Sequence, residues 1–94
     1  MATGTGTAEI DFGAFPGSNE ASVTVSSAGV TAATHVEAWV MGSDSTTDHT
    51  AADHKYFPVF AALTTAPGTD EFTIYGRSTQ KLQGAWAVHY VWAN

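Results

Sequence analysis

The chain has 94 residues, of which 44% are hydrophobic, 12% are aromatic and only 13% are charged. Nine acidic residues against three basic ones give a formal net charge of −6, which excludes nucleic acid and anionic membranes as partners, because almost nothing could neutralise a run of phosphates. The absence of cysteine excludes a disulfide framework and a thiolate metal site. Without a secretory signal or a membrane-length apolar run, residues 1–94 are expected to be one domain made in the cytoplasm.

Apolar residues recur at every second position through most of the chain, which predicts strands. Six such runs follow one another at residues 9–12, 22–26, 35–40, 56–63, 72–75 and 85–93. The first three have one polar face, and the last three are far more apolar. Gly, Pro, Asn and Ser residues between the runs favour turns. The sequence therefore predicts an all-β fold, either a small antiparallel β-sandwich or a jelly-roll-like barrel of about six to eight strands.

The fourth run contains Pro58, which has no N–H group to donate to a neighbouring strand. We therefore expect this strand to lie at a sheet edge or to be bulged at Pro58. An edge strand can recruit a strand or surface from another chain. This makes Pro58 and its neighbour Phe60 candidates for an interface.

The last run, residues 86–93, is apolar on both of its faces, so it is expected to need cover on both sides. A chain of this length has little material to supply that cover, and a partner chain is one source of it. Aromatic rings in this run have three alternative roles: intrachain core, subunit interface, or a platform on which sugars stack. The candidate interface residues are Trp86, Tyr90, Trp92, Pro58 and Phe60.

Potential metal ligands are concentrated in the polar stretch at residues 42–54. His49 and Asp53 are four residues apart and would share a face if this stretch were helical, and His54 follows directly. Neither the spacing of zinc proteases nor that of calcium-binding loops is present. The alternative is a surface loop rich in Asp, with a short capped turn. If a metal binds, a structural ion at a subunit contact is favoured over a catalytic one.

Signals for catalysis are scarce. Glu9 and Asp11 would share one strand face, as would His35 and Glu37, but nothing near them predicts the burial that shifts a carboxyl pKa. A Gly-x-Ser-x-Gly motif, a cysteine nucleophile and a phosphate-binding glycine loop are all missing. The chain is therefore expected not to be an enzyme and to carry no cofactor.

Several stretches of the chain together resemble a group of phage proteins. They are IDFGAFPGSNEASV at residues 10–23, HVEAWVM at 35–41, DHTAADH at 48–54, FTIY at 72–75 and the closing Trp-rich strand. In these stretches the chain is similar to small proteins encoded among the virion-structure genes of tailed bacteriophages. The resemblance implies a virion component on the capsid or the tail, rather than an enzyme, and it carries no binding residues over to this chain.

The resemblance and the low charge lead to two functional hypotheses. The first is a capsid decoration protein, a homo-oligomer such as a trimer that binds the major capsid protein or other virion proteins and stabilises the shell. The alternative is a glycan-binding or host-surface domain of a tail fibre or spike. Under the first hypothesis, residues 1–7 are either an arm that orders on the partner or a flexible tail.

Overall fold

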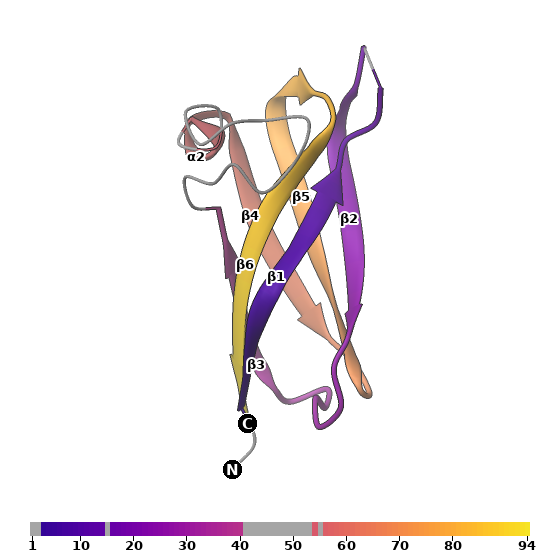
Figure 1. Cartoon of the computed structure of the whole chain (residues 1–94), viewed down its shortest axis with the longest axis vertical. Helices are drawn as coiled ribbons and strands as arrows, with labels where there is room; N and C mark the ends of the chain where they lie inside the picture. The colour runs from indigo at the N-terminus through magenta and orange to yellow at the C-terminus, as the bar shows by residue number, and fades with distance from the viewer. Residues whose placement is uncertain (1–2, 15, 41–53, 55) are drawn as a thin grey trace.

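The computed structural model describes residues 3–14, 16–40, 54 and 56–94, which form six strands and one short helix (Figure 1). In chain order the elements are β1 (Thr3–Asp11), β2 (Ser18–Ser26), β3 (His35–Trp39), α2 (Phe57–Phe60), β4 (Ala61–Pro67), β5 (Glu71–Leu82) and β6 (Ala85–Ala93). The predicted all-β class is therefore confirmed. Within the described residues, no helix is long and apolar enough to span a membrane.

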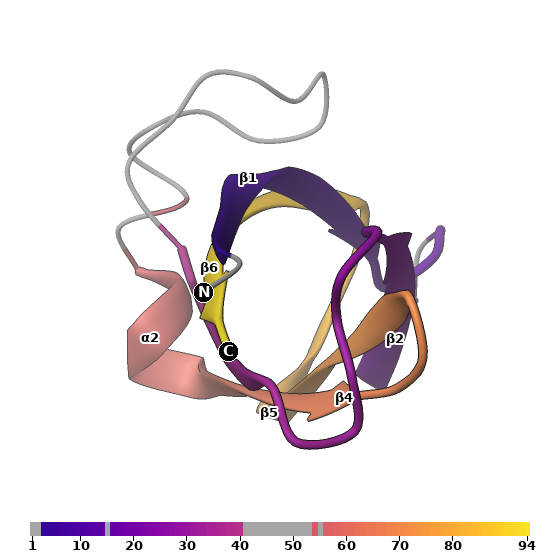
Figure 2. The same ribbon diagram turned by 90° about the horizontal axis from the view of Figure 1, so that it is seen from below.

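The strands form two antiparallel sheets of three strands each. Sheet A has the order β1–β6–β3, and sheet B has the order β2–β5–β4. The two sheets pack together as a small β-sandwich, and Figure 2 shows their strands arranged around a shared interior. β1 lies beside β2, and β3 lies beside β4, so neighbouring edges of the two sheets close the sandwich on both sides.

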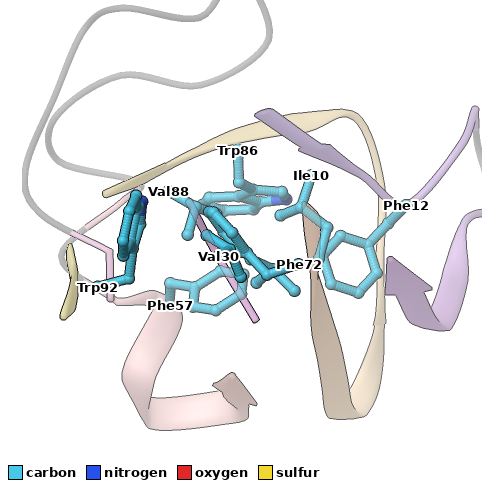
Figure 3. Packing of buried hydrophobic residues seen from close by; sticks show 9 residues of the cluster. Ile10, Phe12, Val30, Phe57, Phe72, Trp86, Val88 and Trp92 are labelled. Atoms are coloured by element: carbon cyan, nitrogen blue, oxygen red, sulfur yellow. The ribbon is translucent and has the colours of Figure 1, made fainter. Parts of the chain in front are cut away.

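Large apolar side chains fill the space between the sheets, as Figure 3 shows. The alternation of side chains along each strand sends every second residue inward, which is why one-faced runs suit this fold. The buried core residues are Ile10, Phe12, Val30, Phe57, Phe72, Ile74, Trp86, Val88 and Trp92. Burial of each of these larger side chains stabilises the fold by about 1.5–3 kcal/mol. The single chain therefore builds a complete core of its own.

The N-terminal segment is a strand and not a free arm. Residues Thr3 to Thr7 belong to β1 and pair with β6, in a register that runs from Thr3 opposite Ala93 to Asp11 opposite Ala85. In this segment the threonines face outward and the alternating glycines face the interior. The expectation of an arm or a flexible tail is therefore wrong for Thr3 to Thr7, while residues 1 and 2 lie outside the described part of the chain.

The run containing Pro58 begins as a helix instead of a strand. α2 covers Phe57–Phe60 with the proline in its first turn, and Ala61 ends the helix in an extended conformation. Proline suits the first turn of a helix because its fixed φ is already helical and its missing N–H has no intrahelical partner there. The expectation that Pro58 lies in an edge strand or at a bulge is therefore wrong.

The strand β5 is longer than its apolar pattern predicts. It continues from Glu71 to Leu82, well beyond the predicted end at Tyr75. Pairing with β2 on one side and β4 on the other supports this strand through polar residues. Gly76, which follows the apolar run, is tightly packed: a Cβ there would lie 3.0 Å from Ile10 Cδ1.

Candidate interaction surface

Two predicted interface residues, Trp86 and Trp92, are core residues of the single chain. They are only 7% and 3% exposed. Trp92 Nε1 donates a hydrogen bond to Ser27 Oγ at 3.0 Å, which pairs the polar group of a buried indole. The Trp86 ring lies 5.3 Å from the ring of Phe57 in α2. The prediction that these two rings form an interface is therefore corrected to the alternative, an intrachain core.

The glycines of β1 make room for two rings of β6. Gly4 lies opposite Trp92, and Gly6 lies opposite Tyr90. A Cβ at Gly4 would collide with the Trp92 indole, and one at Gly6 would come within 2.5 Å of Tyr90 Oη. Tyr90 also packs edge-on against Phe72, with ring centroids 4.9 Å apart. The half-buried Tyr90, a third predicted interface residue, thus packs on the core side of sheet A.

The predicted metal ligands fall partly outside the described residues. His49 and Asp53 lie outside them, whereas His54 is fully buried. His54 Nε2 accepts a hydrogen bond from the backbone N–H of Ala87 at 2.9 Å. An Nε2 lone pair used in this way is not available to a metal ion. Among the described residues, no group of three or more His, Cys, Asp or Glu side chains is placed to hold a metal.

His54 instead has a clear structural position. Trp39, the last residue of β3, lies opposite His89 of β6, so β3 stops before it reaches Ala87. The imidazole of His54 supplies the acceptor for the Ala87 N–H beyond the end of β3, and its ring contacts the Trp86 edge at a centroid distance of 5.2 Å. A buried N–H without an acceptor costs about 1–3 kcal/mol. His54 therefore satisfies a backbone N–H group of sheet A that β3 does not reach.

The residues considered for acid–base catalysis are exposed to solvent. Glu9 and Asp11 of β1, and His35 and Glu37 of β3, are all exposed at the outward positions of sheet A. Asp11 Oδ1 accepts a hydrogen bond from the backbone N–H of Gly13 at 2.7 Å, which is a local turn contact. Exposure to solvent therefore accounts for these four residues, and Asp11 also stabilises a local turn.

Exposed apolar side chains gather around α2. We define the α2 surface as Trp39, Tyr56, Pro58, Val59 and Phe60. Val59 and Tyr56 are 69% and 56% exposed, Trp39 is 39% exposed, and Phe60 is half-buried. Of the five predicted interface residues, Pro58 and Phe60 lie here. The position of this surface relative to the sandwich is fixed, because the buried Phe57 anchors α2 in the core.

Two hollows flank α2. One, of about 180 Å³, lies between β3 and β4 and is lined by Ala38, Trp39, Val40 and Leu63 together with Phe57, Pro58 and Ala61. The other, of about 430 Å³, lies over the start of β4 and the adjoining part of β5, and is lined by residues 58–62 and 77–79. α2 is therefore a ridge between two depressions.

Along the seam between the sheets, the edges of β3 and β4 face each other. Thr65 Oγ1 donates a hydrogen bond to the Val36 carbonyl oxygen at 2.7 Å, which joins the sheets at one point. That carbonyl points away from β6, and because backbone direction alternates along a strand, the N–H and C=O of Ala38 face the seam too. A hollow of about 430 Å³ lies there, lined by residues 36–39 and 63–65. The seam thus extends the apolar hollow beside α2.

Exposed aromatic residues do not form one plane. Trp39 occupies an outward position of β3 in sheet A, whereas Tyr75 occupies an outward position of β5 in sheet B. Tyr56 is exposed beside α2. Because the two sheets face opposite directions, Trp39 and Tyr75 cannot stack on the same sugar chain side by side. The arrangement therefore does not support the multi-ring sugar platform.

Comparison of this chain with protein-family models, curated proteins and solved structures gave no match.

The sequence pattern points to Pro58 and Phe60 but misses the two most exposed members of the α2 surface, Tyr56 and Val59. In a strand, Val59 would alternate with its neighbours, whereas the helical turn at Pro58 changes which side chains face outward. The available signal was the proline itself, since a proline within an apolar run also fits the first turn of a helix.

Proposed function

We propose that this protein is a virion structural protein of a tailed bacteriophage, a decoration protein that binds the assembled capsid and stabilises it. It acts by binding and not by catalysis, and its partners are the major capsid protein or other virion proteins. It works as a homo-oligomer, with a trimer expected where three shell subunits meet. The resemblance in residues 10–23, 35–41, 48–54, 72–75 and the closing strand supports the virion class.

The observation that carries the proposal is an apolar surface left over after the core is complete. Trp86 and Trp92 fill the interior of the single chain, yet Tyr56, Val59 and Trp39 still stand in solvent around α2. Clustered exposed apolar residues on a folded domain mark an interaction site. The described residues hold no cluster of metal-ligating groups that would suggest a reaction there instead. Binding to another protein chain, either a second copy or a shell subunit, is the function that this combination favours.

A decoration protein stabilises its shell by mass action. A protein that binds only the assembled state shifts the assembly equilibrium by RT ln(1 + [L]/Kd) per site, or about 2.7 kcal/mol at a hundredfold excess over Kd. Over the many sites of a shell, modest affinity is sufficient. The rigid sandwich suits this role, because little conformational entropy is lost when a preordered surface binds.

The test is co-sedimentation of the purified protein with expanded capsids, with unexpanded capsids and isolated tails as comparison particles. Saturable binding to expanded capsids, with a rise in the temperature at which those capsids disrupt, supports the proposal. Binding only to tails, or to no particle, contradicts it.

A second candidate is a glycan-binding domain of a tail fibre or spike. One observation favours it: Tyr75 is exposed at the centre of the outer face of sheet B, opposite Ser22 in β2 and Thr64 in β4. An aromatic ring flanked by hydroxyl groups can stack on a sugar while donating and accepting hydrogen bonds. Retention on a glycan array that Tyr75→Ala abolishes would support this candidate.

A further inference from the structure

We propose that the α2 surface is the contact between copies of this chain. This inference rests on the proposed function in one respect, that the protein works as a homo-oligomer. It goes further by assigning the contact to Trp39, Tyr56, Pro58, Val59 and Phe60, in place of the closing strand.

The shape of the α2 surface makes it complementary to itself. α2 stands out from the sandwich as a ridge, as Figure 2 shows, and it has a hollow on each side. The smaller hollow is lined almost entirely by apolar residues, including Ala38, Val40 and Leu63. A copy that places its Val59 ridge in this hollow offers its own hollow to a ridge in return. A surface that holds both a projection and its receptor suits self-association.

The α2 surface is uncharged, so two acidic copies can approach each other there with little repulsion. Each copy has a formal net charge of −6, so two copies repel except where neither presents acidic groups. Of the described acidic residues, Glu9, Asp11 and Glu37 lie on the outer face of sheet A, where Glu37 is two residues from Trp39, while Glu20 and Glu71 lie on sheet B and Asp70 in the β4–β5 turn. The five residues of the α2 surface carry no charge.

Rigidity lowers the entropy lost on association. The Val59 N–H donates a hydrogen bond to the Tyr56 carbonyl at 3.0 Å, which fixes the turn that carries the two most exposed side chains. Phe57 packs against Phe12 and Trp86 at centroid distances of 6.2 and 5.3 Å, so the helix is tied to the core. Side chains held in place before binding lose little conformational entropy on association, and tyrosine is among the residues enriched in interface hot spots.

The test is the mass of the full chain in solution, measured by sedimentation equilibrium over a range of concentrations. The wild-type protein is expected to form a defined oligomer. Val59→Glu places a carboxylate on the ridge, and we expect it to weaken self-association at least tenfold. Because Val59 is 69% exposed, the variant is expected to keep the wild-type circular dichroism spectrum and melting temperature. Tyr56→Ser serves as a second variant that adds no charge.

The matched control is Ala28→Glu. Ala28 is exposed in the connection between β2 and β3, which lies at the end of the sandwich away from α2 (Figure 1), and its substitution adds the same charge. Self-association of this variant is expected to match the wild type. A wild-type protein that stays monomeric at millimolar concentration overturns the proposal, as does equal weakening by Val59→Glu and Ala28→Glu.

The outcome also separates this inference from the proposed function. A monomer that still sediments with capsids overturns the inference and leaves decoration standing. An oligomer that depends on Val59 but ignores capsids and tails supports the inference and contradicts decoration. The measured mass decides the symmetry as well, since a dimer indicates a two-fold contact, and a trimer requires the ridge of each copy to enter the hollow of the next.

Discussion

Gly4 provides a sharp test of how the sandwich core is built, and we expect Gly4→Ala to destabilise the fold. A Cβ at Gly4 would collide with Nε1, Cε2 and Cζ2 of the Trp92 indole. The indole is only 3% exposed and is hydrogen-bonded to Ser27, so it has little room to retreat. The added methyl group must therefore displace either the ring or the β1 backbone.

The magnitude follows from three contributions. Overpacking a filled core costs about 1–3 kcal/mol. Loss of the bond from Trp92 to Ser27 adds about 0.5–1.5 kcal/mol. Alanine regains about 0.5–1 kcal/mol, because glycine is entropically unfavourable in a strand. We expect a net loss of about 2 kcal/mol in the free energy of unfolding, which corresponds to a fall of roughly 8–16 °C in melting temperature for a domain of this size.

Thermal and urea unfolding, followed by tryptophan fluorescence, measure this change. Gly68→Ala is the matched control, since a Cβ at Gly68 meets its nearest neighbours at an ordinary 3.7 Å and its melting temperature should stay within about 2 °C of wild type. The double variant Gly4→Ala/Trp92→Phe should lose less stability than the sum of the single changes, because the smaller ring relieves the collision. A Gly4→Ala protein as stable as wild type would refute the reasoning.

Two further changes test hydrogen bonds that hold the sheets. His54→Phe keeps an aromatic ring but leaves the Ala87 N–H without its acceptor. We expect the free energy of unfolding in urea to fall by about 1–3 kcal/mol and amide exchange at Ala87 to become faster, whereas His54→Gln should retain much of the stability. Equal stability of the Phe variant and the wild type would contradict the role given to His54. Thr65→Val removes the bond to the Val36 carbonyl that joins the two sheets, with an expected loss of about 1 kcal/mol, and an unchanged urea midpoint would show that this bond contributes nothing.

Local alternation was sufficient to predict the strands whose two faces differ. Residues 22–26 and 35–40 place valines and an alanine inward and, apart from Trp39, polar groups outward, and the structure has β2 and β3 there. The prediction works because, in a half-buried strand, apolar residues mark the inward positions and polar residues mark the outward positions. The turn at Gln83 and Gly84 was predictable for a similar reason, since Gly84 has a positive φ of 78° that glycine adopts readily.

Elements that depend on distant contacts were not predictable from local pattern. The Thr-Gly-Thr-Gly segment of β1 reads as a flexible tail, because glycine is unfavourable in an isolated strand. Only the rings of Tyr90 and Trp92, more than 80 residues away in the sequence, require those glycines. Likewise, four residues are too few for a helix to be stable alone, and α2 is held by burial of Phe57. In both cases tertiary packing decides the local structure.

The closing strand β6 explains why the proposed interface lies at α2 and not at the residues expected from the sequence. β6 is the central strand of sheet A, with β1 and β3 on either side. Its inner face fills the core, while its outer face is built mainly of small residues, and His89 there stacks on Trp39 at a centroid distance of 6.3 Å. Among the described residues, apolar side chains remain exposed around α2, where Val59, which lies in a run that reads as a strand, is 69% exposed. The expectation that exposed apolar surface takes a partner therefore supports the proposed contact at α2, where the completed core leaves such surface exposed.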